Sequence, residues 1–358
     1  MTETAPSPDV ATTDVLTLCS PAEVLATVPY MLGFQPADSV VLISLRGPRQ
    51  RVGLTLRADL PQAGTTPLMA EECAGHLCRD GASAAIAVLY GSPQEALWPA
   101  LRAALDALQI PVREALRVDR GRWWSYLCLE PTCCPPEGTP VLRPSDPGGP
   151  VRVGAHMVAA GAAVLDSRQA LADWIAPADP ATLSAVENRL AAVTEEALRR
   201  SVRGGGVSGC RRLWRRQVAA ALRRCRQTSP PSWKDDEVAA LLVALADVPT
   251  RDLAAGWVRT DHGQRSAEAA GAGDPAVQQL WAELTRRAPR PYDVAPASLL
   301  AHAAWLSGHG ALARVAVDRA LRSDPTYRLA LLLQRLLDRG VGPSTPRRSQ
   351  PRASRRGS

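Results

Sequence analysis

Apolar runs in the first part of the chain predict a sheet. Residues 39–46 (SVVLISLR) and 51–59 (RVGLTLRAD) flank a short segment of turn-forming residues, which indicates an antiparallel hairpin. The continuous apolar run over residues 84–90 predicts a buried strand. A second hairpin is expected from residues 112–118 and 122–128, which are joined by Asp-Arg-Gly.

Two helices are predicted among these strands. Residues 66–79 and 94–108 place apolar residues at helical spacing. The resulting order, β-β-α-β-α-β-β, is typical of a mixed α/β domain with helices packed on a sheet. Proline and glycine crowd residues 131–150, which indicates a loop and a domain boundary. We therefore expect an α/β domain at residues 14–150, after a disordered N-terminus at residues 1–13.

From about residue 151 onward, helical periodicity replaces the strand pattern. It predicts an all-α domain at residues 151–341. Several of the helices begin after a capping residue, such as Ser167 or Asp274. The expected helices cover residues 153–165, 168–176, 181–203, 210–227, 234–247 and 274–288.

Residues 297–340 carry the most specific local pattern. Small residues, among them Ala301, Ala304 and Ala313, let two antiparallel helices approach closely, and Pro325 then begins a further helix. This spacing resembles a tetratricopeptide unit, so we expect a tetratricopeptide-like helical hairpin followed by one helix. One such unit cannot bury its own apolar face, so the hairpin should pack on the helices that precede it.

The net charge of +7 is unevenly distributed. Ten arginines and no acids occupy residues 199–226, and five arginines and no acids occupy the C-terminal segment 342–358. Subtracting these fifteen charges from +7 leaves −8, so the remaining chain is acidic. Lys234 is the single lysine, a skew that a GC-rich coding sequence produces, and surplus arginine alone is therefore weak evidence for nucleic-acid binding. The Arg-, Ser- and Pro-rich segment 342–358 is expected to be disordered.

Several protein classes fit the sequence poorly. The longest apolar run, Val238 to Ala246, is nine residues long, whereas a bilayer span needs about 18 to 20. The first residues are polar and acidic, unlike a secretory signal. We therefore expect a cytoplasmic protein with no membrane partner. Its eight cysteines are irregularly spaced, which favours reduced thiols over a disulfide framework.

Cys128, Cys133 and Cys134 are the strongest metal-ligand candidates. They follow a predicted hairpin and enter a Pro-rich knuckle, where thiolates can converge on Zn²⁺. Other interpretations remain open: small buried hydrophobic residues, a knuckle that sets the loop shape, or a nucleophilic or redox thiol. No other cofactor is predicted. A fourth zinc ligand would come from Cys73, His76 or Cys78.

The predicted helix at residues 210–227 is basic and amphipathic. Trp214, Val218 and Leu222 fall on one side. The other side can hold the phosphates of a nucleic acid, although a solvated or internally paired face and a membrane surface are alternatives. The glycine-rich residues 204–209 lack a P-loop ending, so a flexible linker is expected there. The arginines nearest the start of the basic side are Arg211, Arg212, Arg215 and Arg216.

Arg57 and Asp59 are weak candidates for a catalytic site. They lie at the predicted end of a strand, where polar groups often enter a site, but the pattern favours an ordinary ion pair. The sequence has neither the HExxH spacing of zinc peptidases nor the GxSxG motif of hydrolases. His302 lies within the tetratricopeptide-like segment and is expected to be a packing residue.

Four separated segments resemble one known family. They are Ser20–Pro36 (SPAEVLATVPYMLGFQP), the strand end RADLP at 57–61, Cys128 with Cys133-Cys134-Pro135 and Gly138, and the closing stretch LLAHAAWLSGHGALARVAVDRALRSDPTY. Over about residues 14–341 the chain resembles an actinobacterial family described as domain of unknown function 4192. The resemblance implies an actinobacterial source, which agrees with the arginine bias. It implies no activity, cofactor or catalytic residue.

The sequence favours a non-catalytic interaction or regulatory protein with a helical partner-binding region. One alternative is an enzyme or small-molecule binder with a pocket between the sheet and the helical half, using Arg57, Asp59 and Cys128. Another is an arginine-mediated nucleic-acid binder. A deep polar cleft at the junction would favour the enzyme, and an exposed apolar surface on the helices would favour a protein partner.

Overall fold

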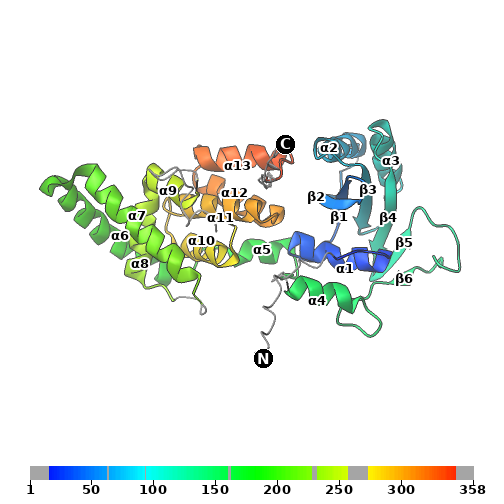
Figure 1. The fold of residues 1–358 in the computed structure, drawn as a ribbon, viewed down its shortest axis with the longest axis horizontal. Coiled ribbons are helices and arrows are strands. Elements are labelled where there is room, and N and C mark those ends of the chain that lie inside the picture. Colours follow the sequence, from blue (N-terminus) through cyan, green and yellow to red (C-terminus); the bar gives the residue numbers. More distant parts are fainter. Residues whose placement is uncertain are drawn as a thin grey trace, which may run out of the picture.

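The computed structural model describes residues 16–62, 64–92, 94–159, 163–227, 232–256 and 273–343. Disorder was predicted for residues 1–13 and 342–358. Residues 1–13 and 344–358 lie outside the described ranges. A sheet with its helices occupies one end of the molecule and a group of helices the other (Figure 1). None of the described helices has the length and apolar character needed to cross a membrane.

The sheet is mixed and has six strands in the order β2-β1-β3-β4-β5-β6. β3 and β4 are parallel, and the other neighbours are antiparallel. The predicted strands are confirmed, except that the last one ends at Ser125, three residues earlier than expected. The strands are β1 (Ser39–Arg46), β2 (Arg51–Asp59), β3 (Ala84–Tyr90), β4 (Val112–Asp119), β5 (Arg122–Ser125) and β6 (Thr139–Pro140).

Helices cover both faces of this sheet. α2 (Thr66–Arg79) and α3 (Leu97–Ala107) bury one face, where Leu42 lies in a core with their leucines. α1 (Pro21–Leu32) covers the other face, where Val41 and Ile43 lie in the second core. Because alternate residues of a strand point to opposite faces, β1 contributes to both cores and is almost wholly buried.

α1 was not predicted by periodicity, although it has clear end signals. The Ser20 side chain accepts a hydrogen bond from the Glu23 amide, and Pro21 occupies the first helical position. Gly33 ends the helix with φ of 80°, a left-handed conformation that favours glycine. Its buried residues surround the helix instead of following one stripe, so no amphipathic pattern marked it.

The rest of the described chain is helical and contains no strand, apart from one bridge between Phe34 and Leu165. Of the helix predicted at 153–165, the described part ends at Ala159, and residues 163–165 are not helical. The helices are α4 (Val151–Ala159), α5 (Arg168–Trp174), α6 (Pro180–Arg200), α7 (Gly206–Cys225), α8 (Asp235–Ala246), α9 (Val248–Ala254), α10 (Pro275–Arg287), α11 (Val294–Leu306), α12 (Gly310–Ser323) and α13 (Arg328–Asp338).

The flexible linker predicted at residues 204–209 is wrong. A single π-helical segment, Ser201–Gly205, follows α6 directly, and α7 begins at Gly206. The glycines therefore form the turn of a tight helical hairpin. Sequence reasoning treated them as flexible because glycine is entropically costly in helices, but tight reversals between helices also require it.

α11, α12 and α13 form where the tetratricopeptide-like segment was expected. Ala301, Ala304 and Ala313 are fully buried, which lets α11 and α12 pack closely. α11 also contacts α10, α8 and α9, so the hairpin packs on earlier helices as predicted. The resemblance of this segment to a tetratricopeptide unit stays a prediction.

The two ends of the molecule meet at two places. Near α5, the Leu165 amide donates to the Gly33 carbonyl and the Gln35 amide to the Leu165 carbonyl, both at 2.9 Å. Near the end of α13, Arg79 Nε donates to the Arg339 carbonyl at 3.4 Å. One apolar core runs from the α1 face of the sheet, through Leu171 of α5, to the helices beyond.

Burial of His302 predicts a loss of stability in acid. Burial lowers the pKa of His302 from 6.5 to about 4, so between these values the unfolded chain binds a proton that the folded chain does not. Stability should therefore fall as pH falls through this window, by about 3 kcal/mol for this residue. Burial also lowers the pKa of His76 and His309, in the same direction. Urea unfolding at pH 7 and 4.5 measures the loss, which should be smaller in His302→Phe; an equal loss would contradict the assignment.

Candidate functional site

The three candidate cysteines converge after β5. The Sγ atoms of Cys128 and Cys133 are 3.0 Å apart, and those of Cys133 and Cys134 are 3.7 Å apart. All three lie within 4.8 Å of one another. Two thiolates that each bind a tetrahedral Zn²⁺ at ~2.3 Å stand ~3.8 Å apart, so small side-chain movements bring the group to zinc geometry.

Backbone hydrogen bonds hold this knuckle together. Ser125 Oγ accepts from the Cys128 amide at 3.1 Å and donates to Glu114 Oε1 of β4 at 2.9 Å. The Glu130 carbonyl accepts from the amides of Cys133 and Cys134, at 3.2 and 2.8 Å. The turn between the cysteines is therefore set by the main chain and anchored to the sheet through Ser125.

Gly138 closes the loop that carries the cysteines. Its φ is 80°, and a Cβ atom there would lie 2.5 Å from the Trp124 ring, so a side chain would displace the loop. Trp124 Nε1 donates to the Pro136 carbonyl at 2.9 Å, and Arg122 donates to the Gly138 carbonyl at 2.6 Å. Both donors come from β5, so the strand that precedes Cys128 also holds the segment after Cys134.

The thiols of the cluster differ in acidity. The hydrogen bond from Cys133 lowers the pKa of Cys128. The same bond raises the pKa of Cys133, and burial, with the neighbouring thiols, raises the pKa of Cys134 to about 12. Cys128 is therefore the first thiol of the cluster to lose its proton as pH rises, and its thiolate is the first to bind a metal ion or react with an electrophile.

The cysteines do not pack as buried hydrophobic residues. Cys133 is exposed, and Cys128 and Cys134 are half-buried, whereas Cys73, Cys210 and Cys225 are buried. The interpretation of the cluster as core residues is thus wrong. Leu127 and Leu129, which flank Cys128, are 42% and 88% exposed, so the knuckle also presents apolar surface.

The suggested fourth ligands do not join the cluster. Cys73 lies on the buried side of α2, where it contacts Met69, and burial raises the pKa of Cys73 to about 12. His76 packs against Gly340, at the end of α13. Among the described residues, the metal-competent group consists of Cys128, Cys133 and Cys134 alone, which leaves one position of a tetrahedral ion to water or to another molecule.

Comparison with known families bears directly on this region. A family model described as a domain of unknown function (DUF4192) matches residues 21–344, which include the sheet, the knuckle and every described helix from α1 to α13. The chain belongs to this family. Comparisons with curated proteins and with solved structures give no match. For this DUF4192 chain, functional inference therefore depends on the geometry of its own residues.

Arg57 and Asp59 do not share a site with Cys128. The two residues form an ion pair 2.5 Å long on β2, an edge strand, where Asp59 is 81% exposed. Three strands separate β2 from β5. Asp59 pairs with Ser39 and therefore lies level with the carboxyl end of β3. Ser125 pairs with Leu116, and the chain that follows Ser125, which includes Cys128, runs toward the start of β4. These residues occupy opposite corners of the sheet.

The arginines of α6 and α7 are largely paired within the protein. Arg211 donates to Asp247 through two nitrogens, and Arg224 binds Glu237 and lies over the Trp233 ring. Arg212 and Arg216 are exposed, whereas Arg211 and Arg215 are half-buried. Of the four arginines predicted to hold phosphate, two therefore face solvent openly, and the phosphate-binding face is smaller than the sequence suggested.

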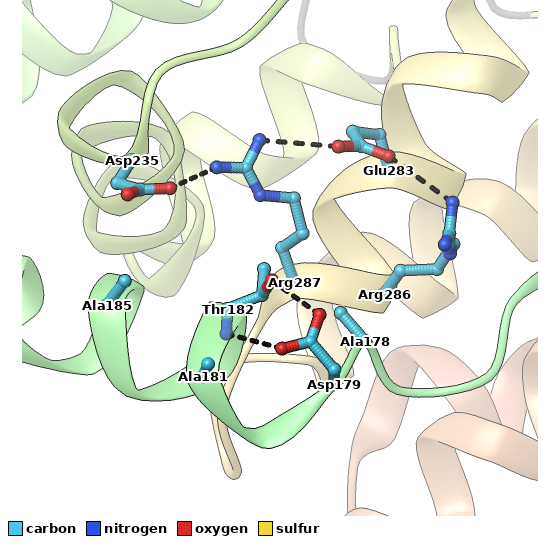
Figure 2. A pocket seen from close by; sticks show the side chains of 9 residues that line it. All are labelled: Ala178, Asp179, Ala181, Thr182, Ala185, Asp235, Glu283, Arg286 and Arg287. Carbon is cyan, nitrogen blue, oxygen red and sulfur yellow. Dashed lines mark hydrogen bonds and ion pairs between the residues drawn. The ribbon is translucent and has the colours of Figure 1, made fainter.

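A cavity of about 540 Å³ lies between the starts of α6 and α8 and the end of α10 (Figure 2). Asp179 caps α6 by accepting from the Thr182 amide at 3.0 Å. Arg287 binds Asp235 and Glu283, and Glu283 also pairs with Arg286 (Figure 2). Sequence reasoning missed this cavity because its walls come from three distant segments. Three carboxylates and two arginines line it, and both arginines already pair with carboxylates, so we assign it no ligand.

Proposed function

We propose that this DUF4192 chain is a zinc-binding protein whose Cys128–Cys133–Cys134 cluster holds one Zn²⁺. The convergence of three accessible thiols within 4.8 Å carries the proposal. Thiolate sulfur is a preferred zinc ligand, and a main-chain turn fixed to the sheet supplies the preorganisation that binding requires. Because zinc–thiolate sites need reduced cysteines, a cytoplasmic location is part of the proposal.

The site fits a structural or docking role better than a hydrolytic one. Three thiolates bring more negative charge than one Zn²⁺ neutralises, which weakens the ion as a Lewis acid. Glu114 and Glu130 add negative charge nearby, since both act on the thiols of the cluster. A weak Lewis acid activates bound water poorly. Exposed Leu127 and Leu129 give the knuckle an apolar surface that suits contact with another protein.

Metal analysis of the protein, purified mildly and without chelator, tests the proposal. We expect about one zinc ion per chain, and less than about a tenth of an equivalent would overturn the proposal. Mass measurement of the intact protein tests the competing redox interpretation. A disulfide between Cys128 and Cys133 in freshly purified, metal-free protein would also overturn the zinc assignment, because oxidised sulfur is no longer a thiolate ligand.

Zinc binding should release protons. Since the thiols of Cys133 and Cys134 have raised pKa values, they are protonated in the metal-free protein near neutral pH. Each must lose its proton to coordinate zinc, so we expect at least about two protons released per ion and an affinity that rises with pH. Titration of metal-free protein with ZnCl₂ in dilute buffer, followed by a pH electrode, measures the release. Binding without proton release would contradict coordination by these thiols.

A second function, protein–protein interaction, is favoured by the hairpin of α6 and α7. Figure 1 shows this hairpin projecting at the end of the molecule opposite the sheet. Leu198, Val202 and Val207 near its turn are 64%, 79% and 58% exposed. Arg203 follows Val202 directly in the sequence, and both Arg203 and Arg212 of this hairpin are exposed. An apolar tip beside arginines suits an acidic, amphipathic segment of a partner protein.

The tetratricopeptide-like interpretation of residues 297–340 belongs to this second proposal. Helical repeats stack to form extended surfaces for partners. In this chain α11 is almost completely buried between its neighbours, which leaves α12 and α13 as the outer helices of the segment. The non-catalytic interaction role is supported by these surfaces together with the hairpin tip.

Substitution at the hairpin tip should abolish partner capture. Introducing two acids, Leu198→Glu with Val202→Glu, repels an acidic partner and removes apolar contact area. We expect the specific partner recovered from an actinobacterial host, the source that the family resemblance implies, to be lost from the variant. Leu332→Glu, at a 55% exposed position on α13, is the control that should retain the partner. Loss of all co-purifying material on nuclease treatment would point to nucleic acid and contradict the proposal.

A further inference from the structure

A second, smaller cavity lies between α5 and the helical hairpin of α11 and α12. Its volume is about 160 Å³. It is distinct from the cavity of Figure 2, whose lining residues it does not share. The polar residues that line it are Gln169, Asp173, Arg290, Asp293, Arg319 and Arg322.

Arg319 is the unusual member of this group. Its side chain is only 9% exposed, and its Nε is buried without a hydrogen-bond acceptor. One terminal nitrogen donates to the Thr285 carbonyl at 3.1 Å and reaches Asp293 Oδ2 only at 3.4 Å. A buried cation whose carboxylate partner lies at 3.4 Å is incompletely neutralised, and an anion in the cavity that the Arg319 side chain lines would complete the neutralisation.

The carboxylates around Arg319 are already engaged. Asp293 Oδ1 accepts from Ser323 Oγ at 2.7 Å, and Asp173 Oδ1 accepts from Gln169 Nε2 at 2.8 Å. Three arginines and two aspartates line the cavity, which leaves one positive charge in excess. Burial, together with the charges of Arg322 and Arg290, lowers the pKa of Arg319. The cavity is therefore short of one negative charge.

We propose that this cavity binds the carboxylate group of a small monoanionic ligand, held by Arg319 and flanked by Arg290 and Arg322. A carboxylate has the planar pair of acceptors that a guanidinium binds best, and one negative charge balances the excess. A phosphate dianion would leave the site negative beside two aspartates. The site is separate from the zinc cluster and the hairpin tip, so it adds a small-molecule ligand to the functions proposed above.

Isothermal titration with sodium acetate at constant ionic strength tests this site, with sodium chloride and inorganic phosphate as comparison anions. We expect saturable acetate binding, no binding of chloride, and weaker binding of phosphate. Arg319→Gln should weaken acetate binding by about tenfold or more. Because Arg319 is buried and its loss can unfold the chain, Arg322→Gln, at an exposed position, provides a second variant that should weaken binding severalfold.

Arg335→Gln on α13 is the matched control, since this exposed arginine does not line the cavity. The acetate affinity of this variant should equal that of the unmodified protein. Equal acetate affinity in Arg322→Gln and in Arg335→Gln would overturn the proposal. Tighter binding of phosphate than of acetate would overturn the carboxylate assignment, and no acetate binding would overturn the site itself.

Discussion

Cys133→Ser should reduce the zinc content of the purified protein from about one ion per chain to less than about a tenth. Cys133 is the central thiol, because its Sγ atom lies within 3.7 Å of the Sγ atoms of both Cys128 and Cys134. Its loss leaves only these two sulfur atoms to bind the ion. Zinc affinity should fall by more than about a hundredfold, because even residues that only support a metal ligand contribute up to that factor. Competition with a chromophoric chelator measures the affinity.

Cys78→Ser is the control for this experiment. Cys78 is an exposed thiol on α2 and lies outside the cluster. Its replacement removes one cysteine with the same chemistry and should leave zinc content and affinity unchanged. Equal zinc loss in both variants would show that the metal binds elsewhere or nonspecifically.

Trp281→Ala should destabilise the protein by about 3 to 5 kcal/mol. Trp281 lies on α10, is 2% exposed, and is among the largest fully buried side chains of the described chain. It belongs to the core shared by α8, α10 and α11, so the substitution leaves a large cavity where several helices meet. A loss of this size is a large part of the 5 to 15 kcal/mol typical of folded domains. Guanidinium unfolding, followed by circular dichroism, gives the change.

A surface substitution provides the comparison. Leu332 on α13 is 55% exposed, so Leu332→Ala should change stability by less than about 0.5 kcal/mol. If Trp281→Ala lowered the free energy of unfolding no more than Leu332→Ala does, the packing described for α10 would be incorrect.

The sequence predicted β1 to β5 and most helices because their signals are local, whereas the two-residue β6 lies in the segment predicted to be a loop. β1 to β4 have apolar runs bounded by turn residues, and α10 begins at the predicted cap, Asp274. α1 escaped notice because it buries residues all around its axis. The hairpin turn at Gly206 was mistaken for a linker because composition alone does not distinguish a glycine-rich turn from a flexible segment.

The candidate sites differ in the same way. The cysteine cluster was visible in the sequence because its members lie within seven positions and share one chemistry. The cavity around Arg319 was not, since Asp173 lies on α5, Arg290 in the turn before α11 and Arg319 on α12, and the two arginines do not stand out from the many others. Residues 57, 59 and 128 were grouped because they looked polar or reactive at strand ends, but strand order could not be derived from the sequence.

The shared apolar core has a practical consequence for work with fragments. α4 packs on α1, and the Leu165 bridge to Phe34 lies beyond it, so a chain cut at residue 150 would lose both the helix that covers α1 and this bridge. The side of α1 that α4 covers would then meet solvent, which favours self-association. Truncations intended to isolate the sheet should therefore extend past α4 and Leu165, and a fragment that stops at the proline-rich loop should precipitate on expression.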